Sequence, residues 1–146
     1  MNMAEMVIAK CNVLGAAGDP DYRQTVRCGR HELLADERPA RGGADAGPMP
    51  FEYLLAGLGA CTSITLRMYA ERKGWEIGAV GGSLSLRQAQ QGTRSIDRRV
   101  TLSGALSAEQ REKLADICEK TPVTLAVKSG LSVRTTLEGS APPTPQ

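Results

Sequence analysis

The stretch that most constrains this chain is residues 47–61, where closely spaced prolines lead into an apolar helix that contains a cysteine. Pro48 and Pro50 suit a helix start, because the first turn needs no backbone donors. Apolar and small side chains then recur at intervals of three and four residues, which predicts a helix over 50–73 that is closed by Gly74. Its predicted buried stripe comprises Leu54, Leu55, Leu58, Cys61, Thr62 and Thr65.

Two glycines inside this predicted helix indicate close packing around the cysteine. Gly57 and Gly59 each cost roughly 1 kcal/mol in a helix interior. Their presence suggests that the small residues at 56–60 let another backbone come very close. Aromatic residues are scarce, at 3% of the chain, so the core must be built from aliphatic side chains. Such a core gains from burial across a subunit interface.

Length and charge exclude several classes of protein. With 146 residues, the chain is expected to form a single domain over 1–138, followed by a disordered proline-rich tail over 139–146. The net charge of +2 is too small to indicate a nucleic-acid partner, and Arg94, Arg98 and Arg99 are interpreted as the solvent side of a strand. No run of eighteen apolar residues exists, so we expect no membrane segment and a cytoplasmic protein.

The cysteines are expected to remain thiols. In a reducing compartment Cys11, Cys28, Cys61 and Cys118 are not expected to form structural disulfides. Their wide spacing and the lone His31 do not match a zinc site, so no metal is predicted.

The remaining pattern predicts an α+β domain with strands on both sides of its helices. Ser107 and Gln110 form a capping box that opens a later helix, and Pro122 is expected to interrupt that helix. The loop over 36–49 is long enough to suggest a functional role. Strands are predicted at 4–14, 22–28, 30–35, 79–89, 96–104 and 131–137.

These residues carry a resemblance to a known family. Residues 47–61 read Gly-Pro-x-Pro-x-Glu-x-Leu-Leu-Ala-x-Leu-Gly-x-Cys, and Thr-Pro-Val comes later, ahead of the last predicted strand. Over residues 20–138 the chain resembles the OsmC/Ohr family of osmotically inducible and organic hydroperoxide resistance proteins. The resemblance implies an OsmC-like α+β fold, with antiparallel strands around two helices. It also implies an intertwined homodimer with paired central helices and thiol sites at the subunit interface.

The resemblance assigns a role to Cys61. From periodicity alone, Cys61 is either a small buried hydrophobe or a placed nucleophile. In the family, the peroxide-attacking cysteine has the motif position that Cys61 has here. The second, resolving cysteine of the peroxidase members directly precedes Pro-Val, where this chain has Thr121. Cys118 lies one helical turn earlier, so it is either a displaced resolving cysteine or core filler.

The glutamate of the family motif is also displaced by one residue in this chain. In the peroxidase members a glutamate immediately follows the proline and pairs with an arginine beside the reactive thiol. Here Phe51 has that position and Glu52 follows, so Glu52 either serves the same role or only favours the helix dipole. The candidate arginines closest in sequence are Arg38 and Arg41, and Arg23 and Arg27 are the other choices.

By this resemblance, the expected function is thiol-dependent reduction of organic hydroperoxides in oxidative stress defence. An external dithiol would regenerate the enzyme, and no cofactor is required. The alternative is a non-peroxidatic OsmC-like protein that binds an apolar small molecule at the dimer interface, which the replacements at Phe51 and Thr121 favour.

Overall fold

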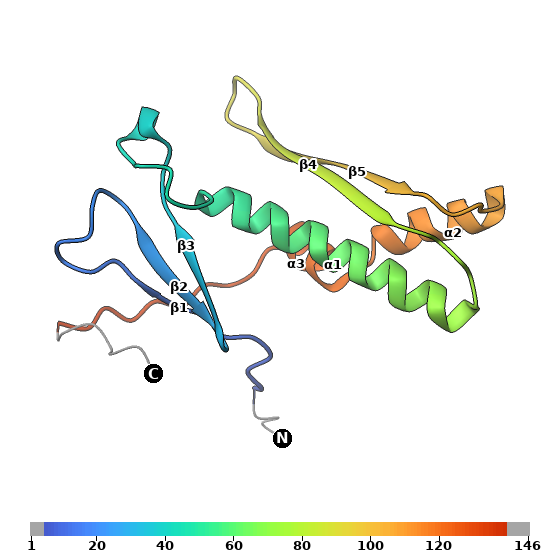
Figure 1. Ribbon diagram of the computed structural model, residues 1–146, viewed down its shortest axis with the longest axis horizontal. Helices are drawn as coiled ribbons and strands as arrows, with labels where there is room; N and C mark the ends of the chain where they lie inside the picture. Colours follow the sequence, from blue (N-terminus) through green and yellow to red (C-terminus); the bar gives the residue numbers. More distant parts are fainter. Residues whose placement is uncertain (1–4, 140–146) are drawn as a thin grey trace. The chain divides into compact units, whose positions relative to one another are not determined.

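The computed structural model describes residues 5–139, which divide into two compact units (Figure 1). Unit 1 comprises residues 5–52 and 136–139, and unit 2 comprises residues 53–135. Each unit is described by itself below. The single domain expected over 1–138 stays a prediction, and the predicted tail lies almost entirely outside the described residues.

Unit 1 is built on a three-stranded antiparallel sheet in the order β1-β2-β3. Its strands are β1 (Asn12–Leu14), β2 (Gln24–Cys28) and β3 (His31–Ala35). A tight turn joins β2 to β3, where Gly29 has a φ of 60°, which glycine adopts without steric cost. The second and third strands agree with the predictions for 22–28 and 30–35. The first is much shorter than the predicted strand over 4–14.

A disulfide joins β2 to the residue that precedes β1. Asn12 pairs with Arg27 in the antiparallel register, so Cys11 and Cys28 lie opposite each other one position further along. Their Cα atoms are 4.5 Å apart, and the two cysteines form a disulfide. The expectation that they remain thiols is therefore wrong. Strand register brings the pair together, and a sequence separation of 17 residues does not reveal that register.

The loop after β3 is organised by a buried carboxylate. Asp36 is 2% exposed and accepts hydrogen bonds from the backbone N–H groups of Glu37, Ala44 and Ala46. The N–H of Ala46, followed by those of Glu37 and Ala44, holds the pKa of Asp36 below its usual value despite the opposing effect of burial. The loop also contains a short 3-10 helix, η1 (Pro39–Arg41).

Unit 2 combines three helices with one long hairpin. The helix α1 (Pro50–Lys73) has the predicted bounds and is followed by β4 (Val80–Gln88) and β5 (Arg94–Leu102). The two strands pair antiparallel over their full length and run alongside α1 (Figure 1). Two short helices, α2 (Ala108–Cys118) and α3 (Pro122–Ser129), complete the unit.

The core of unit 2 lies between α1, the hairpin and α2. Its buried residues are Leu66, Ala70, Ile77, Leu114 and Cys118. Val80 of β4 and Val100 and Leu102 of β5 pack against this cluster. The same face of β5 that carries these apolar side chains therefore faces the helices.

The predicted break at Pro122 is confirmed, and it makes three helices in place of two. The capping box of Ser107 and Gln110 is present at the start of α2. Thr121 caps α3, and Pro122 takes the first helical position, where its missing N–H costs nothing. The α+β class of the prediction is confirmed.

The strand predicted over 131–137 is not formed. Leu131, Val133 and Leu137 are 77%, 86% and 96% exposed. Alternation predicts a strand only where a neighbouring strand supplies hydrogen bonds, and within residues 5–139 this segment pairs with none.

Candidate functional site

The buried stripe of α1 differs from the predicted one. Leu58, Thr62, Leu66 and Ala70 are the buried residues of this helix, and they recur at intervals of four. Cys61 is only half-buried, because it precedes Thr62 by one residue and its side chain is rotated by about 100° from that stripe. Cys61 therefore lies at the edge of the packed face of α1.

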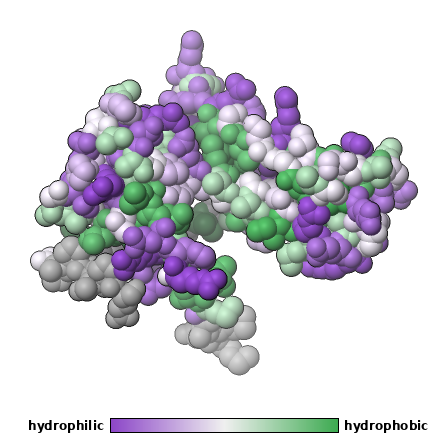
Figure 2. Space-filling model, viewed as in Figure 1, coloured by the Kyte–Doolittle hydropathy of each residue, from purple (hydrophilic) through white to green (hydrophobic). Residues whose placement is uncertain are grey.

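Within unit 2, α1 has a second apolar stripe, which includes the position of Cys61 and is largely exposed. Leu54, Ile64 and Met68 are 42%, 59% and 48% exposed. A Cβ added to Gly57 would meet no atom within 4 Å. Positions 54, 57, 61, 64 and 68 alternate intervals of three and four, as in helices that pair along a seam. Figure 2 shows apolar residues in a band over the region that α1 occupies in Figure 1.

The two helical glycines have different surroundings. A Cβ on Gly59 would lie 2.8 Å from Cδ1 of Leu84, so this glycine allows β4 to pack against α1 within the chain. Of the small-residue face predicted at 56–60, Gly59 therefore packs against the hairpin, whereas Gly57 has no neighbouring atom on its side of the helix among the residues that the structure describes.

Cys61 is a free cysteine with a hydroxyl as its polar neighbour. Its Sγ lies 4.0 Å from Oγ1 of Thr65, one helical turn further along α1. The contact places a group that can donate a hydrogen bond beside the sulfur.

Arg98 is a charged side chain that lies almost buried inside unit 2. It was interpreted above as solvent-facing, but its side chain is only 12% exposed, so that interpretation is wrong. On β5 it lies two residues from Ile96 and from Val100, on the face that is turned toward the helices. A guanidinium cannot lose its charge in this setting, so its N–H groups need polar partners.

The hydrogen bonds of Arg98 join α1 to the α2–α3 junction. One terminal nitrogen donates to Oγ1 of Thr62, at 2.9 Å, and to Oγ1 of Thr124, at 2.8 Å. The other donates to the backbone carbonyl of Cys118, at 2.9 Å, and lies 3.6 Å from the carboxylate of Glu119. Arg98 therefore links the residue after Cys61 to the turn that carries Cys118.

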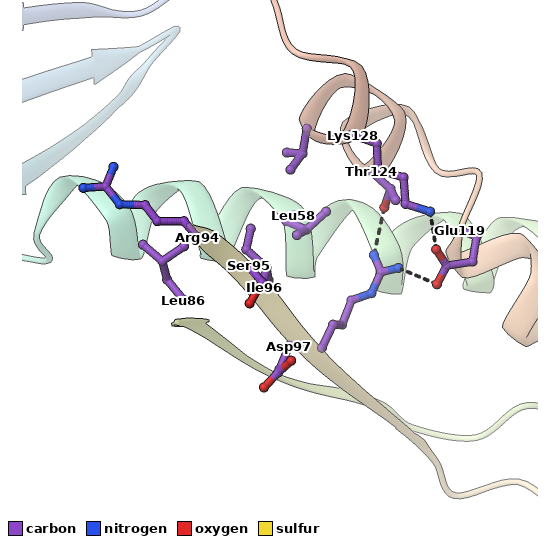
Figure 3. A pocket seen from close by; sticks show the side chains of 11 residues that line it. Leu58, Leu86, Arg94, Ser95, Ile96, Asp97, Glu119, Thr124 and Lys128 are labelled. Atoms are coloured by element: carbon purple, nitrogen blue, oxygen red, sulfur yellow. Dashed lines mark hydrogen bonds and ion pairs between the residues drawn. The ribbon is translucent and has the colours of Figure 1, made fainter. Parts of the chain in front are cut away.

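Glu119 completes this charged group. Figure 3 shows Glu119, Thr124 and Lys128 converging at one end of a pocket. Lys128 donates to the Glu119 carboxylate, and this hydrogen bond is the main reason why the pKa of Glu119 lies below its usual value, with Arg98 adding to the effect.

The position of the family's second cysteine is occupied by a buried hydroxyl. Thr121 is fully buried, and its hydroxyl lies 2.7 Å from that of Thr124. Cys118 is 9% exposed and belongs to the apolar core, and its burial raises the pKa of its thiol above the usual value, although Arg98 opposes the shift. Cys61 and Cys118 therefore occupy different environments, one at the edge of α1 and one inside the core.

A pocket of about 600 Å³ lies between the hairpin, α1 and α3 (Figure 3). Leu58, Leu86, Ile96 and Val127 form its apolar walls, and Arg98, Glu119, Thr124 and Lys128 contribute polar groups. Cys61 does not line it. The pocket has the size and mixed lining of a small-molecule site.

The predicted acid and arginine meet in unit 1. Arg38 forms an ion pair with Glu52, whose other carboxylate oxygen accepts the N–H of Met49 at 2.9 Å. That backbone bond is the largest cause of the lowered pKa of Glu52, and Arg38 adds to it. Arg41 is exposed in η1.

The other two candidate arginines also pair within unit 1. Arg23 pairs with Asp19 and Arg27 with Glu32. Cys61 and Cys118 belong to unit 2.

Arg98 is the site residue that sequence reasoning missed. The signal was available, because Ile96, Arg98, Val100 and Leu102 share one face of an alternating strand. A charged residue within such a series indicates a buried, partnered charge.

Comparison with known proteins shows which family this chain resembles. The family model described as OsmC-like protein matches residues 42–136. The chain belongs to the OsmC-like family. No curated protein sequence matches this OsmC-like chain.

Several solved structures share the fold of this OsmC-like protein. One is a Psychrobacter arcticus protein assigned to the osmotic stress and detoxification response, with 15% identity, a TM-score of 0.70 and coverage of 86% of this chain and 91% of the other. The Legionella pneumophila organic hydroperoxide resistance protein OsmC has 17% identity, a TM-score of 0.64 and coverage of 86% and 92%. Bacillus subtilis OhrB, an organic hydroperoxide resistance protein, has 21% identity, a TM-score of 0.58 and coverage of 84% and 91%.

Among the residues that the structure describes, no helix combines the length and the apolar character that crossing a membrane requires.

Proposed function

We propose that this OsmC-like protein is a thiol-dependent peroxidase that reduces organic hydroperoxides through Cys61. The observation that carries the proposal is a free, half-buried thiol on α1 at the motif position of the family's reactive cysteine. The Legionella and Bacillus proteins of similar fold are named for organic hydroperoxide resistance.

The proposed reaction begins at the sulfur of Cys61. Its thiolate attacks the distal oxygen of the hydroperoxide and breaks the O–O bond. The products are a sulfenic acid on Cys61 and an alkoxide, which takes up a proton and leaves as an alcohol. The Arg38–Glu52 pair and Arg41 remain proposed as the groups that orient the peroxide.

We also propose that the protein acts as a homodimer through the exposed apolar stripe of α1. Leu54, Ile64 and Met68 expose apolar area that a second copy of α1 would bury, and Gly57 leaves room for its backbone. The exposed segment over 131–137, which alternates in polarity, would gain a strand partner in the same assembly.

The experiment that tests the peroxidase compares Cys61→Ser with the wild type. We expect Cys61→Ser to abolish consumption of cumene hydroperoxide in the presence of dithiothreitol, while circular dichroism shows an unchanged fold. Iodoacetamide should label Cys61 at neutral pH faster than the buried Cys118. Undiminished peroxide consumption by Cys61→Ser would refute the proposal.

The second candidate function is binding of an apolar small molecule without chemistry. It is favoured by Phe51 and Thr121, which stand where the peroxidase members carry the glutamate and the second cysteine. The pocket of about 600 Å³ offers apolar walls to such a ligand. Retention of an apolar ligand by a protein whose Cys61 resists oxidation would support this function over the first.

A further inference from the structure

We infer that the sulfenic acid on Cys61 is resolved by an external small thiol and not by Cys118. The inference rests on the proposed function and concerns the step that follows the first oxidation. Three features of unit 2 carry it: the burial of Cys118, the position of Cys61 on α1, and the hydrogen bonds that hold the α2–α3 junction.

The first feature is the burial of Cys118. Its side chain is 9% exposed and packs in the core cluster with Leu66, Ala70 and Leu114. A resolving cysteine must attack as a thiolate, and burial among apolar side chains disfavours that charged form. Cys118 therefore resembles a structural cysteine more than a nucleophile.

The second feature is the direction of Cys61 from α1. The α1 members of the cluster around Cys118, Leu66 and Ala70, lie on the same stripe as Thr62. Cys61 is rotated by about 100° from this stripe and is not part of the cluster. A disulfide requires Cβ vectors that face each other as well as Cα atoms within about 7 Å. The position of Cys61 outside the core face of α1 therefore does not favour a disulfide with Cys118.

The third feature is the hydrogen bonding of the α2–α3 junction. Arg98 donates to the carbonyl of Cys118, and it also holds Thr62 on α1 and Thr124 on α3. Moving the backbone of Cys118 toward Cys61 would break its hydrogen bond to a buried charge, and charge-assisted hydrogen bonds are among the strongest in a protein. These hydrogen bonds therefore oppose a movement of Cys118 toward Cys61.

The fully buried Thr121 closes the other route to an internal disulfide. It occupies the place of the family's second cysteine, and a hydroxyl cannot form a disulfide. A small thiol needs no wider access to Cys61 than the organic hydroperoxide of the proposed function does.

The chemistry balances with two thiol equivalents per peroxide. The first thiol attacks the sulfur of the sulfenic acid, forms a mixed disulfide with Cys61 and releases water. A second thiol attacks the mixed disulfide, restores the Cys61 thiol and leaves as the oxidised reductant. In a dithiol such as dithiothreitol, both thiols belong to one molecule.

The test compares the wild type with Cys118→Ala, which removes the thiol and leaves a small apolar side chain in the core. Each protein receives one equivalent of cumene hydroperoxide without thiol. Dimedone then traps any sulfenic acid, and mass spectrometry maps adducts and disulfides. Turnover is measured separately with dithiothreitol, and circular dichroism confirms the fold of the variant.

We expect a dimedone adduct on Cys61 in equal yield in both proteins, and turnover of Cys118→Ala within about twofold of the wild type. A Cys61–Cys118 disulfide in the wild type would overturn the inference and leave the peroxidase intact, even if Cys118→Ala failed to fold. A tenfold loss of turnover in a folded Cys118→Ala would do the same. If Cys61 were not oxidised at all, the proposed function itself would fall, and this inference with it.

Discussion

Replacing Arg98 by methionine tests how much the hydrogen bonds of its guanidinium contribute to the stability of unit 2. Methionine keeps the apolar stem of the side chain and removes the guanidinium. The Oγ1 atoms of Thr62 and Thr124 and the carbonyl of Cys118 then lose their donor. Thr62 and Thr124 are 2% and 4% exposed, so water cannot readily replace the donor.

The size of the effect follows from these contacts. Hydrogen bonds to a charged group contribute about 1.5–3 kcal/mol each, and the variant loses three of them. Part of the loss is offset, because the variant no longer buries a charge. We therefore expect the free energy of unfolding to fall by about 3 kcal/mol. In a chain of this length that corresponds to a Tm lower by roughly 6–12 °C.

Arg99 supplies the matched control. It is the next residue on β5, it is exposed, and the alternation of the strand turns it to the opposite face. Arg99→Met should change the free energy of unfolding by less than about 0.5 kcal/mol. Both variants are compared with the wild type by urea unfolding and by calorimetry at one protein concentration. A loss below about 1 kcal/mol for Arg98→Met, or equal losses for the two variants, would show that the buried hydrogen bonds of Arg98 do not hold unit 2 together.

Three further predictions address association, the disulfide and acid stability. Gly57→Leu should abolish dimers in sedimentation while the chain stays folded, whereas Gly59→Leu should lower Tm by clashing with β4; a dimer that survives Gly57→Leu would contradict the proposed interface. Replacing Cys11 and Cys28 together by serine should lower the free energy of unfolding in urea by about 3 kcal/mol, as expected for a closed loop of this length, and an unchanged midpoint would contradict this. The lowered pKa of Asp36 means that its stabilising effect is complete above its unfolded pKa of about 4 and is lost as the pH falls through the folded pKa. The difference in Tm between wild type and Asp36→Asn should accordingly shrink as the pH falls below about 4, and a constant difference would show that the carboxylate charge has no such role.

The elements that depend on local signals could be predicted from the amino-acid sequence alone. The bounds of α1 follow from proline at its start, glycine beyond its end and a regular apolar period, and they agree with the structure at both ends. The capping box at Ser107 and the break at Pro122 are also confirmed, because each depends on the hydrogen bonds of a single helical turn. The family motif around Cys61 lies within such a local segment, which is why the family could be predicted.

Features that need two distant segments to meet depend on tertiary contacts. The Cys11–Cys28 disulfide needs the register of two strands, which no local pattern specifies. The position of Arg98 on the apolar face of β5 is visible in the sequence, but the hydroxyl partners that satisfy its charge come from the packing of β5 against α1 and α3. The segment over 131–137 alternates as a strand should, yet a strand forms only where a neighbour supplies a ladder of hydrogen bonds. The local sequence determines which helix or strand a segment is able to form. Whether that element forms depends on the partners that satisfy its polar groups and bury its apolar face.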